Sequence, residues 1–313
     1  MELSATLQRF ISVAFLVGLF GVYASAQRLT VISWNLESGG SSITAITERV
    51  RRFQGVDLWG LSEVAGDATL KAFQAAAEDG EHANFQRLIS VTGCGDRLGI
   101  VFNATRLKLM RAEELHRITY DADEPPPGSC QRSPLVAEFR DMRSSRRFLF
   151  MVNHLSRDDR NLRHAQGQRL NEWVQTQAFP VIAVGAYNFD WSVTNGDRTH
   201  DAGFDKMVAG GHWAWMRPKT LIKSHCNPKN NSILDFVFVS MSARPFALNS
   251  EILQEANDCA NAAVNPDYRP LKAVFDFIGA PAEQGPTRAE LLRRIEALER
   301  EISELKALML RSP

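Results

Sequence analysis

Short apolar runs recur along the chain, and the polar stretches between them predict alternating strands and helices. Residues 29–34 alternate apolar and polar side chains and are rich in β-forming types, so they predict a first strand. Residues 42–53 predict a helix that begins at a serine N-cap. Residues 56–61 predict a buried strand and residues 67–78 a second helix. This alternation indicates an α/β architecture.

The middle of the chain changes to strand-like patterns. A loop with three consecutive prolines, residues 121–133, interrupts it, and residues 160–179 predict another helix. The candidate strands of this part are residues 98–102, 107–115, 135–139 and 148–152.

A third apolar run, residues 181–184, predicts a buried strand that Gly185 ends. Asn188 is then expected just past the strand's carboxyl end, where α/β proteins carry their chemistry. Residues 190–230 have little periodicity and predict long loops around a short helix. Residues 233–239 and 271–277 predict the last strands of the domain.

The first residues have the pattern of an export signal. Residues 10–23 are nearly all apolar, and Ala24-Ser25-Ala26 supplies the small residues of a cleavage site. The run is shorter than the roughly 20 apolar residues that a membrane helix needs. We therefore predict a signal peptide over residues 1–26, favoured over an uncleaved anchor, and a secreted or periplasmic mature chain.

Export changes the interpretation of the cysteines. An even number of cysteines outside the cytoplasm favours disulfides over metal ligation or buried free thiols. We favour Cys94–Cys130 and Cys226–Cys259, because each pair brackets one segment.

The carboxyl-terminal part of the chain differs from the preceding domain in its sequence pattern. After a domain over residues 27–279, residues 280–286 contain two prolines and a glycine and predict a linker. In residues 287–313, apolar side chains recur at alternating steps of four and three, which gives a seam about three heptads long. Two interpretations stay open: a coiled coil that makes a homo-oligomer, or an amphipathic helix docked on its own domain.

The net charge of the chain excludes few classes of function. The 313 residues contain 36 Lys plus Arg and 36 Asp plus Glu, so the net charge is zero and gives no support for a DNA-coating protein. Local basic patches remain compatible with this balance.

Polar side chains follow five successive predicted strands at the point where each strand ends. They are Asn35, Glu63, His154, Asn188 and Asp235. Taken singly, each such residue is more often structural than functional. Together, oxygen ligands that converge at one sheet edge suit Mg²⁺ or Mn²⁺, and a nearby histidine suits phosphate chemistry.

In these motifs the chain resembles the endonuclease/exonuclease/phosphatase family over roughly residues 28–277. Six motifs occur in the family's order: Ser33-Trp34-Asn35-Leu36, Leu61-Ser62-Glu63-Val64, Val152-Asn153-His154-Leu155, Gly185-Ala186-Tyr187-Asn188, Ile233-Leu234-Asp235-Phe236 and Pro266-Asp267-Tyr268-Arg269-Pro270. The resemblance implies a four-layer α/β sandwich, with two packed β-sheets between outer helices.

The resemblance also implies roles for individual residues. Asn35 and Glu63 look like metal-site residues, with Glu63 the principal carboxylate, and Asp267 looks like a further ligand at the end of the last strand. The implied metal is Mg²⁺ or Mn²⁺, with Ca²⁺ as an alternative. Family members cut phosphoester bonds by in-line attack of water.

Three other residues resemble the family's phosphate-handling groups. His154 resembles the histidine that contacts the scissile phosphate or the leaving oxygen. Asn188 looks like the residue that orients the phosphate or the attacking water. Asp235 resembles the carboxylate that orients the family's final histidine.

Two positions depart from the family. Ala186 stands where an aspartate is usual, and Tyr268 stands where the final histidine is usual. A methyl group accepts no proton, and a phenol with an ordinary pKa of about 10 supplies no imidazolium-like charge at neutral pH. We therefore predict a hydrolase that is severely impaired or inactive, as a natural pseudoenzyme or as an altered form of an active parent.

Nucleic acid is the favoured substrate, with sphingomyelin or a smaller phosphoester as the alternative within the family. A non-catalytic module that binds a phosphate ligand is the alternative from another class. Arg97, Arg157, Arg160 and Arg163 flank the motifs and could contact phosphates, although each alone fits a solvated surface charge. Three tryptophans after Asn188 could stack on bases or enter a lipid interface, but core packing is the favoured interpretation: Trp191, Trp213 and Trp215.

Overall fold

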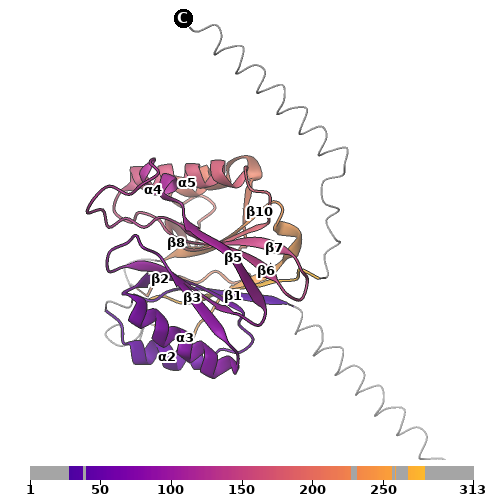
Figure 1. The fold of residues 1–313 in the computed structure, drawn as a ribbon. Helices are drawn as coiled ribbons and strands as arrows, with labels where there is room; N and C mark the ends of the chain where they lie inside the picture. The colour runs from indigo at the N-terminus through magenta and orange to yellow at the C-terminus, as the bar shows by residue number, and fades with distance from the viewer. Residues whose placement is uncertain (1–27, 38–39, 227–230, 256–257, 259–266, 279–313) are drawn as a thin grey trace, which may run out of the picture. The chain divides into compact units, whose positions relative to one another are not determined.

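Two β-sheets packed face to face, with helices on both outer faces, make up the part of the chain that the structure describes (Figure 1). The structure is a computed structural model, and it describes residues 28–37, 40–226, 231–255, 258 and 267–278. This arrangement confirms the four-layer α/β sandwich.

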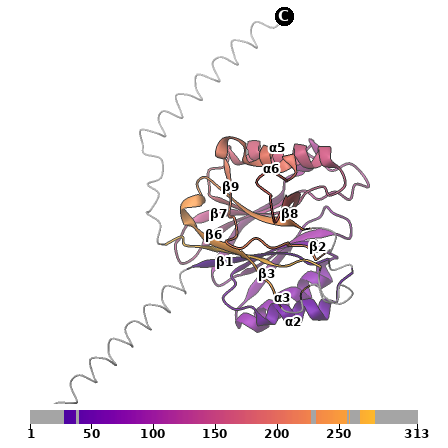
Figure 2. The same cartoon turned by 180° about the vertical axis from the view of Figure 1, so that it is seen from behind.

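The first sheet contains both ends of the described chain. Its strand order is β11-β12-β1-β2-β4-β3, and only β1 and β2 are parallel among its neighbours. The helices α2 and α3 lie along its outer face (Figures 1 and 2). The bounds are β1 (Leu29–Asn35), α2 (Ile43–Arg52), β2 (Leu58–Val64), α3 (Asp67–Glu81), β3 (Phe85–Ile89), β4 (Arg97–Asn103), β11 (Ala247–Ile252) and β12 (Leu271–Phe275).

The second sheet has the order β5-β6-β7-β8-β10-β9, and only β7 and β8 are parallel neighbours. Figures 1 and 2 show α4, α5 and α6 on its outer side. The bounds are β5 (Leu107–Glu114), α4 (His116–Tyr120), β6 (Leu135–Asp141), β7 (Arg147–His154), α5 (Arg160–Val174), β8 (Val181–Ser192), α6 (Ala202–Val208), β9 (Trp213–Trp215) and β10 (Ser232–Ser240), with short 3₁₀ turns at Ala209–Gly211 and Arg244–Phe246.

The two sheets approach each other closely at Gly60 of β2. A Cβ added there would lie 2.4 Å from Cγ2 of Val184 on β8 and 3.0 Å from Cζ of Phe150 on β7. Only the absence of a side chain lets the backbone of one sheet meet the side chains of the other at this distance. The parallel pairs β1–β2 and β7–β8 therefore lie against one another, which sets the position of the site.

Several sequence predictions of element bounds were wrong. The helix predicted through Phe179 ends at Val174, and four short elements were missed: α4, β3, β9 and β11. The largest error concerns Gly185, which does not end its strand, because β8 continues through it to Ser192. Its φ of +128° makes it an irregularity inside the strand instead.

The tryptophans after Asn188 belong to the packed interior. Trp191 and Trp213 are 4% and 2% exposed. Trp213 Nε1 donates to the carbonyl of Leu170 at 3.1 Å, and Trp191 and Trp215 pack with ring centroids 4.9 Å apart. Core packing, rather than base stacking or lipid contact, accounts for these residues.

One predicted disulfide is present. Cys94 and Cys130 are bonded, with their Cα atoms 5.1 Å apart. The second favoured pair includes Cys259, which lies outside the described residues, as do the predicted signal peptide, the linker and the amphipathic helix over residues 287–313. Within the described ranges, no helix is long and apolar enough to cross a membrane.

Candidate active site

The parallel pair β1–β2 brings Asn35 and Glu63 together. Asn35 is the last residue of β1, and its Nδ2 donates to Oε1 of Glu63 at 2.6 Å. Glu63 has a φ of +55°, where the pairing of β2 with β4 shifts register. Such a bulge re-aims a side chain, and here it accompanies the contact between the Glu63 carboxylate and the Asn35 amide.

The second sheet places three predicted residues in a row across neighbouring strands. Ala186 of β8 pairs with His154 of β7 on one side and with Asp235 of β10 on the other. Directly paired residues present their side chains on the same face of a sheet, with Cβ atoms roughly 4.5–5.5 Å apart. A carboxylate at position 186 would therefore stand between the imidazole and the carboxylate of its neighbours.

The position of Asp235 within its strand differs from the prediction. β10 runs antiparallel to β8, so Asp235 lies near the amino end of its strand rather than at the carboxyl end. The two ends meet at one sheet edge because the strands are antiparallel.

Asn188 also lies differently from the prediction. It is inside β8 rather than past its end, and its φ of +55° belongs to a distorted segment that also includes Gly185 and Asp190. A Cβ at Gly185 would lie 2.0 Å from the carbonyl oxygen of Asn153, so the segment depends on glycine. Asn188 Nδ2 donates to the carbonyl of Leu155 at 2.9 Å, which holds the amide against the exit of β7.

His154 is buried between cationic and anionic groups. Its Nε2 lies 3.4 Å from Nη2 of Arg132 and 3.7 Å from Oε1 of Glu63. Burial lowers the pKa of His154 well below its usual range, and the charges of Arg132 and Arg157 lower it further. The imidazole is therefore neutral at pH 7, and a guanidinium that donates to Nε2 leaves its proton on Nδ1.

Asp235 is a buried carboxylate that forms no ion pair with the residues that the structure describes. It is 3% exposed, and neither of its carboxylate oxygens has a hydrogen-bond partner among the described residues. Burial raises the pKa of Asp235 to about 7, which the nearby Ser224 hydroxyl opposes and the charge of Glu63 reinforces. A histidine that Asp235 would orient is missing from position 268.

Tyr268 is part of the core of the first sheet. It is 4% exposed, and its carbonyl accepts from Nε1 of Trp34 at 2.9 Å. Burial raises the pKa of Tyr268, and the charges of Asp235 and Glu63 raise it further, so the phenol stays protonated at neutral pH. It cannot act as the cationic partner that the resemblance implies at this position.

Asp267 lies before β12 and not at the end of a last strand, which corrects the sequence prediction. Its backbone N–H donates to Oε2 of Glu37 at 3.3 Å, and its buried Oδ1 has no partner among the described residues. Burial and the charge of Asp267 raise the pKa of Glu37. Two carboxylates thus lie close together at the site's edge.

The four arginines that the sequence proposes as phosphate contacts differ in burial and in their partners. Arg163 is a structural residue: it donates to the carbonyls of Ser156 and Arg157 and to Asp201. Arg160 is exposed and lies 3.9 Å from Asp201, and Arg97 donates to the carbonyl of Cys94. Arg157 is exposed, and its charge acts on His154, His225, Glu37 and Tyr268, so it is the best placed of the four to meet a bound phosphate.

A divalent metal fits this site only as an ion shared with substrate. In the described ranges, no three His, Cys, Asp or Glu side chains gather closely enough to hold a metal alone. Asn35 and Glu63 offer one amide and one carboxylate, and Asp267 adds a buried oxygen without a partner. Mg²⁺ in phosphate sites takes one or two carboxylates and completes its shell with water and phosphate oxygens, which matches this donor set.

Sequence reasoning missed several residues of the site. Arg132 and Asp96 form an ion pair of 2.8 Å beside His154, and Ser224, His225 and Glu37 lie close to Asp235 and Asp267. One signal could have found the first two. The predicted Cys94–Cys130 disulfide joins the loops that carry Asp96 and Arg132, so those loops had to meet.

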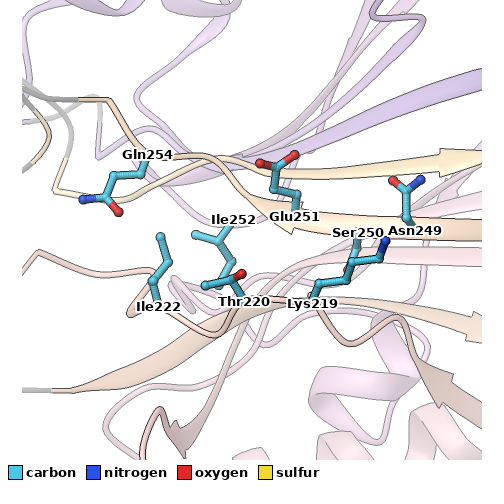
Figure 3. A pocket seen from close by; sticks show the side chains of 8 residues that line it. All are labelled: Lys219, Thr220, Ile222, Asn249, Ser250, Glu251, Ile252 and Gln254. Carbon is cyan, nitrogen blue, oxygen red and sulfur yellow. The ribbon is translucent and has the colours of Figure 1, made fainter.

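A separate hollow of about 570 Å³ lies along the edge strand β11. Figure 3 shows the residues that line it, which come from β11 and from the loop that carries Lys219, Thr220 and Ile222. None of the predicted site residues lines this hollow, so we do not assign it to the active site.

Solved structures with this fold are numerous. An endonuclease/exonuclease/phosphatase family protein from Bacteroides thetaiotaomicron is 17% identical, covers 79% of this chain and 97% of its own, and has a TM-score of 0.62. A mannosyl-6-phosphatase from the same species is 18% identical over 78% and 98% of the two chains, with a TM-score of 0.60. D. rerio TDP2 complexed with single strand DNA product is 15% identical over 79% and 98%, also with a TM-score of 0.60.

These comparisons confirm the fold that the resemblance implies: the chain has the architecture of the endonuclease/exonuclease/phosphatase proteins. No protein-family model matches the sequence. No curated protein matches it either.

Proposed function

We propose that this site belongs to a divalent-metal-dependent phosphodiesterase that acts on nucleic acid. The observation that carries the proposal is the row His154–Ala186–Asp235 beside the hydrogen-bonded pair Asn35–Glu63. The first group handles phosphate and protons, and the second offers ligands for Mg²⁺ or Mn²⁺. A metal bound there would polarise the phosphoryl oxygens.

The residues of the chain divide the remaining work. Glu63, Asn35 and Asp267 would hold the metal. The neutral His154 carries its proton on Nδ1, and this nitrogen is the one that can donate a hydrogen bond to a phosphate oxygen. Arg157 can pair with the charge of the phosphate. Asn188 keeps the segment after β7 in place through its bond to Leu155.

Ala186 makes this chain a poor hydrolase. The group between His154 and Asp235 would hold or deprotonate the attacking water, and a methyl group does neither. Acid–base groups contribute about 10²–10⁴-fold each, and losses within one catalytic unit do not add. We expect a chain that binds its substrate and turns it over very slowly.

Nucleic acid is the substrate that the comparisons support best, because the TDP2 neighbour was solved with a single-stranded DNA product. The mannosyl-6-phosphatase neighbour supports a smaller phosphoester, and a lipid phosphodiester such as sphingomyelin is the remaining alternative in this class. The alternative from another class is a non-catalytic phosphate-binding protein, which the alanine at position 186 favours.

The test is metal-dependent cleavage of DNA, RNA, sphingomyelin and a generic phosphodiester by the chain and by Ala186→Asp/Tyr268→His. We expect the double variant to exceed the unchanged chain by at least about 10²-fold, with DNA or RNA as the preferred substrate. Equal turnover by the two chains would contradict the predicted impairment. An inactive double variant that still binds a phosphate ligand in calorimetry would favour the binding protein.

We also propose that the chain works outside the cytoplasm. The Cys94–Cys130 disulfide supports this location, because structural disulfides persist in oxidising compartments. Cleavage near Ala26, visible as the amino-terminal sequence of the exported protein, would test it.

A further inference from the structure

A short antiparallel ladder joins the segment before β10 to the segment before β12. His225 bridges Tyr268, Cys226 N donates to the carbonyl of Asp267 at 2.6 Å, and Arg269 N donates to the carbonyl of Ser224 at 2.8 Å. Opposed residues of such a pair present side chains on the same face. The rings of His225 and Tyr268 accordingly lie with centroids 4.5 Å apart.

The same segment is fixed to the active site by Ser224. Its Oγ accepts from the backbone N–H groups of Leu234 and Asp235, at 2.9 and 3.3 Å. His225 is therefore held between β10, which carries Asp235, and the residues Asp267 and Tyr268. Two backbone attachments on neighbouring residues leave the ring little freedom to lie elsewhere.

His225 is buried and has a ring nitrogen that a ligand could contact. It is 7% exposed, and its Nδ1 has no hydrogen-bond partner among the described residues. Most buried polar atoms in folded proteins have a hydrogen-bond partner, from the protein, a ligand or ordered water. The charges that act on His225 come from Arg157, Lys223 and Asp267, two cations and one anion, which suits a phosphate group.

We propose that His225 contacts the substrate phosphate and supplies the second imidazole of this site. Tyr268 occupies the position where the resemblance places a histidine, and the neighbouring imidazole of His225 carries the nitrogens that a phenol lacks. This inference rests on the proposed function. It makes Ala186, rather than Tyr268, the residue that limits the activity of the chain.

The alternative is that His225 only packs on Tyr268, and His225→Phe separates the two roles. A phenylalanine keeps a ring on Tyr268 and removes both nitrogens. We would introduce it into Ala186→Asp and, as the matched background, into Ala186→Asp/Tyr268→His, and measure metal-dependent cleavage of plasmid DNA by all four chains. Thermal unfolding would verify that each chain is folded.

We expect His225→Phe to lower the activity of Ala186→Asp by about 10²-fold. In the background with a histidine at position 268, the loss should be at least tenfold smaller, because a second imidazole is then present. Equal losses in both backgrounds would overturn the inference. So would an inactive Ala186→Asp chain beside an active double variant.

Inactivity of all four chains would refute the proposed function, and a binding measurement then decides the inference separately. The imidazole resonances of His225, assigned by their absence in His225→Phe, would be followed while thymidine 3′,5′-bisphosphate is added to the unchanged chain. A saturable shift of these resonances supports the phosphate contact. Unmoved resonances at a saturating ligand concentration refute it.

Discussion

Asp235 keeps an ionisable group buried without an ion pair among the described residues, and this has a measurable cost in stability. Its folded-state pKa of about 7 lies above the ordinary value of 3.8. A carboxyl with a raised pKa contributes stability that is complete below its unfolded pKa and is lost as the pH rises through its folded pKa. The unchanged chain therefore loses stability from this residue between pH 4 and pH 7.

We predict that Asp235→Asn is more stable, relative to the unchanged chain, at pH 8 than at pH 5. The relative gain between these pH values is at most about 3 kcal/mol, from roughly 1.4 kcal/mol for each of the two pH units between pH 5 and the folded pKa. Urea unfolding at the two pH values in the presence of a chelator measures it, with exposed Asp158→Asn as the control for loss of a surface carboxylate. A stability difference that is the same at both pH values would contradict the raised pKa.

At this scale the sequence identified candidate site residues that the structure places close together, but not all of the residues that contact them. Asn35, Glu63 and His154 came from ordered motifs, and the structure brings them together at one edge. Arg132 and His225 were missed because they lie in loops whose neighbours are fixed by long-range contacts. The predicted Cys94–Cys130 disulfide indicates that the loops of Asp96 and Arg132 meet, but no sequence pattern marks His225.

Among the elements, the loops that the Cys94–Cys130 disulfide joins hold one wall of the site. One loop carries Asp96 and the other Arg132, whose guanidinium lies against both Asp96 and His154. The bond spans 36 residues of sequence. In the chain-entropy account, a loop of this length gives about 3–4 kcal/mol of stability by restricting the unfolded state.

We predict that Cys94→Ser/Cys130→Ser loses about 3–4 kcal/mol of unfolding free energy. The same change should raise KM more than it lowers kcat in the Ala186→Asp/Tyr268→His background, because it loosens the groups beside His154 without removing them. Cleavage kinetics and urea unfolding measure both effects. A change below about 1 kcal/mol would show that the loops are held by their other contacts.

Strand and helix prediction succeeded where the pattern was long and failed where it was short or irregular. Residues 29–34 and 67–78 were assigned to the correct type because a strand or helix period runs through each. β9 has three residues and gives no period. In β8 the glycine that ordinarily ends a strand instead occupies an irregular position inside it, which only the pairing with β7 and β10 reveals.

For the whole molecule, the seam in residues 287–313 decides whether the protein acts as one copy or several. If the seam forms a coiled coil, light scattering should give a multiple of the chain's mass for the full protein and a single-chain mass after deletion of these residues. A single-chain mass for both would favour a helix docked on its own domain.

The alternation of elements predicted the α/β class, and the four layers were predictable only from the family resemblance that the ordered motifs carry. The order of strands within each sheet was not, because neighbours such as β12 and β1 come from opposite ends of the domain. Sheet order depends on contacts distant in sequence, and the same contacts create the ladder that positions His225.

The alanine in the row His154–Ala186–Asp235 also bears on how firmly the site could hold an anionic ligand. An aspartate at that position would set one more negative charge beside an already crowded group of carboxylates and against an incoming phosphate. Without it the pocket repels anions less, while the arginine and histidine contacts remain. On the proposed function, slow turnover with these contacts intact would let the protein hold a phosphate ligand without cleaving it, as a substrate trap does.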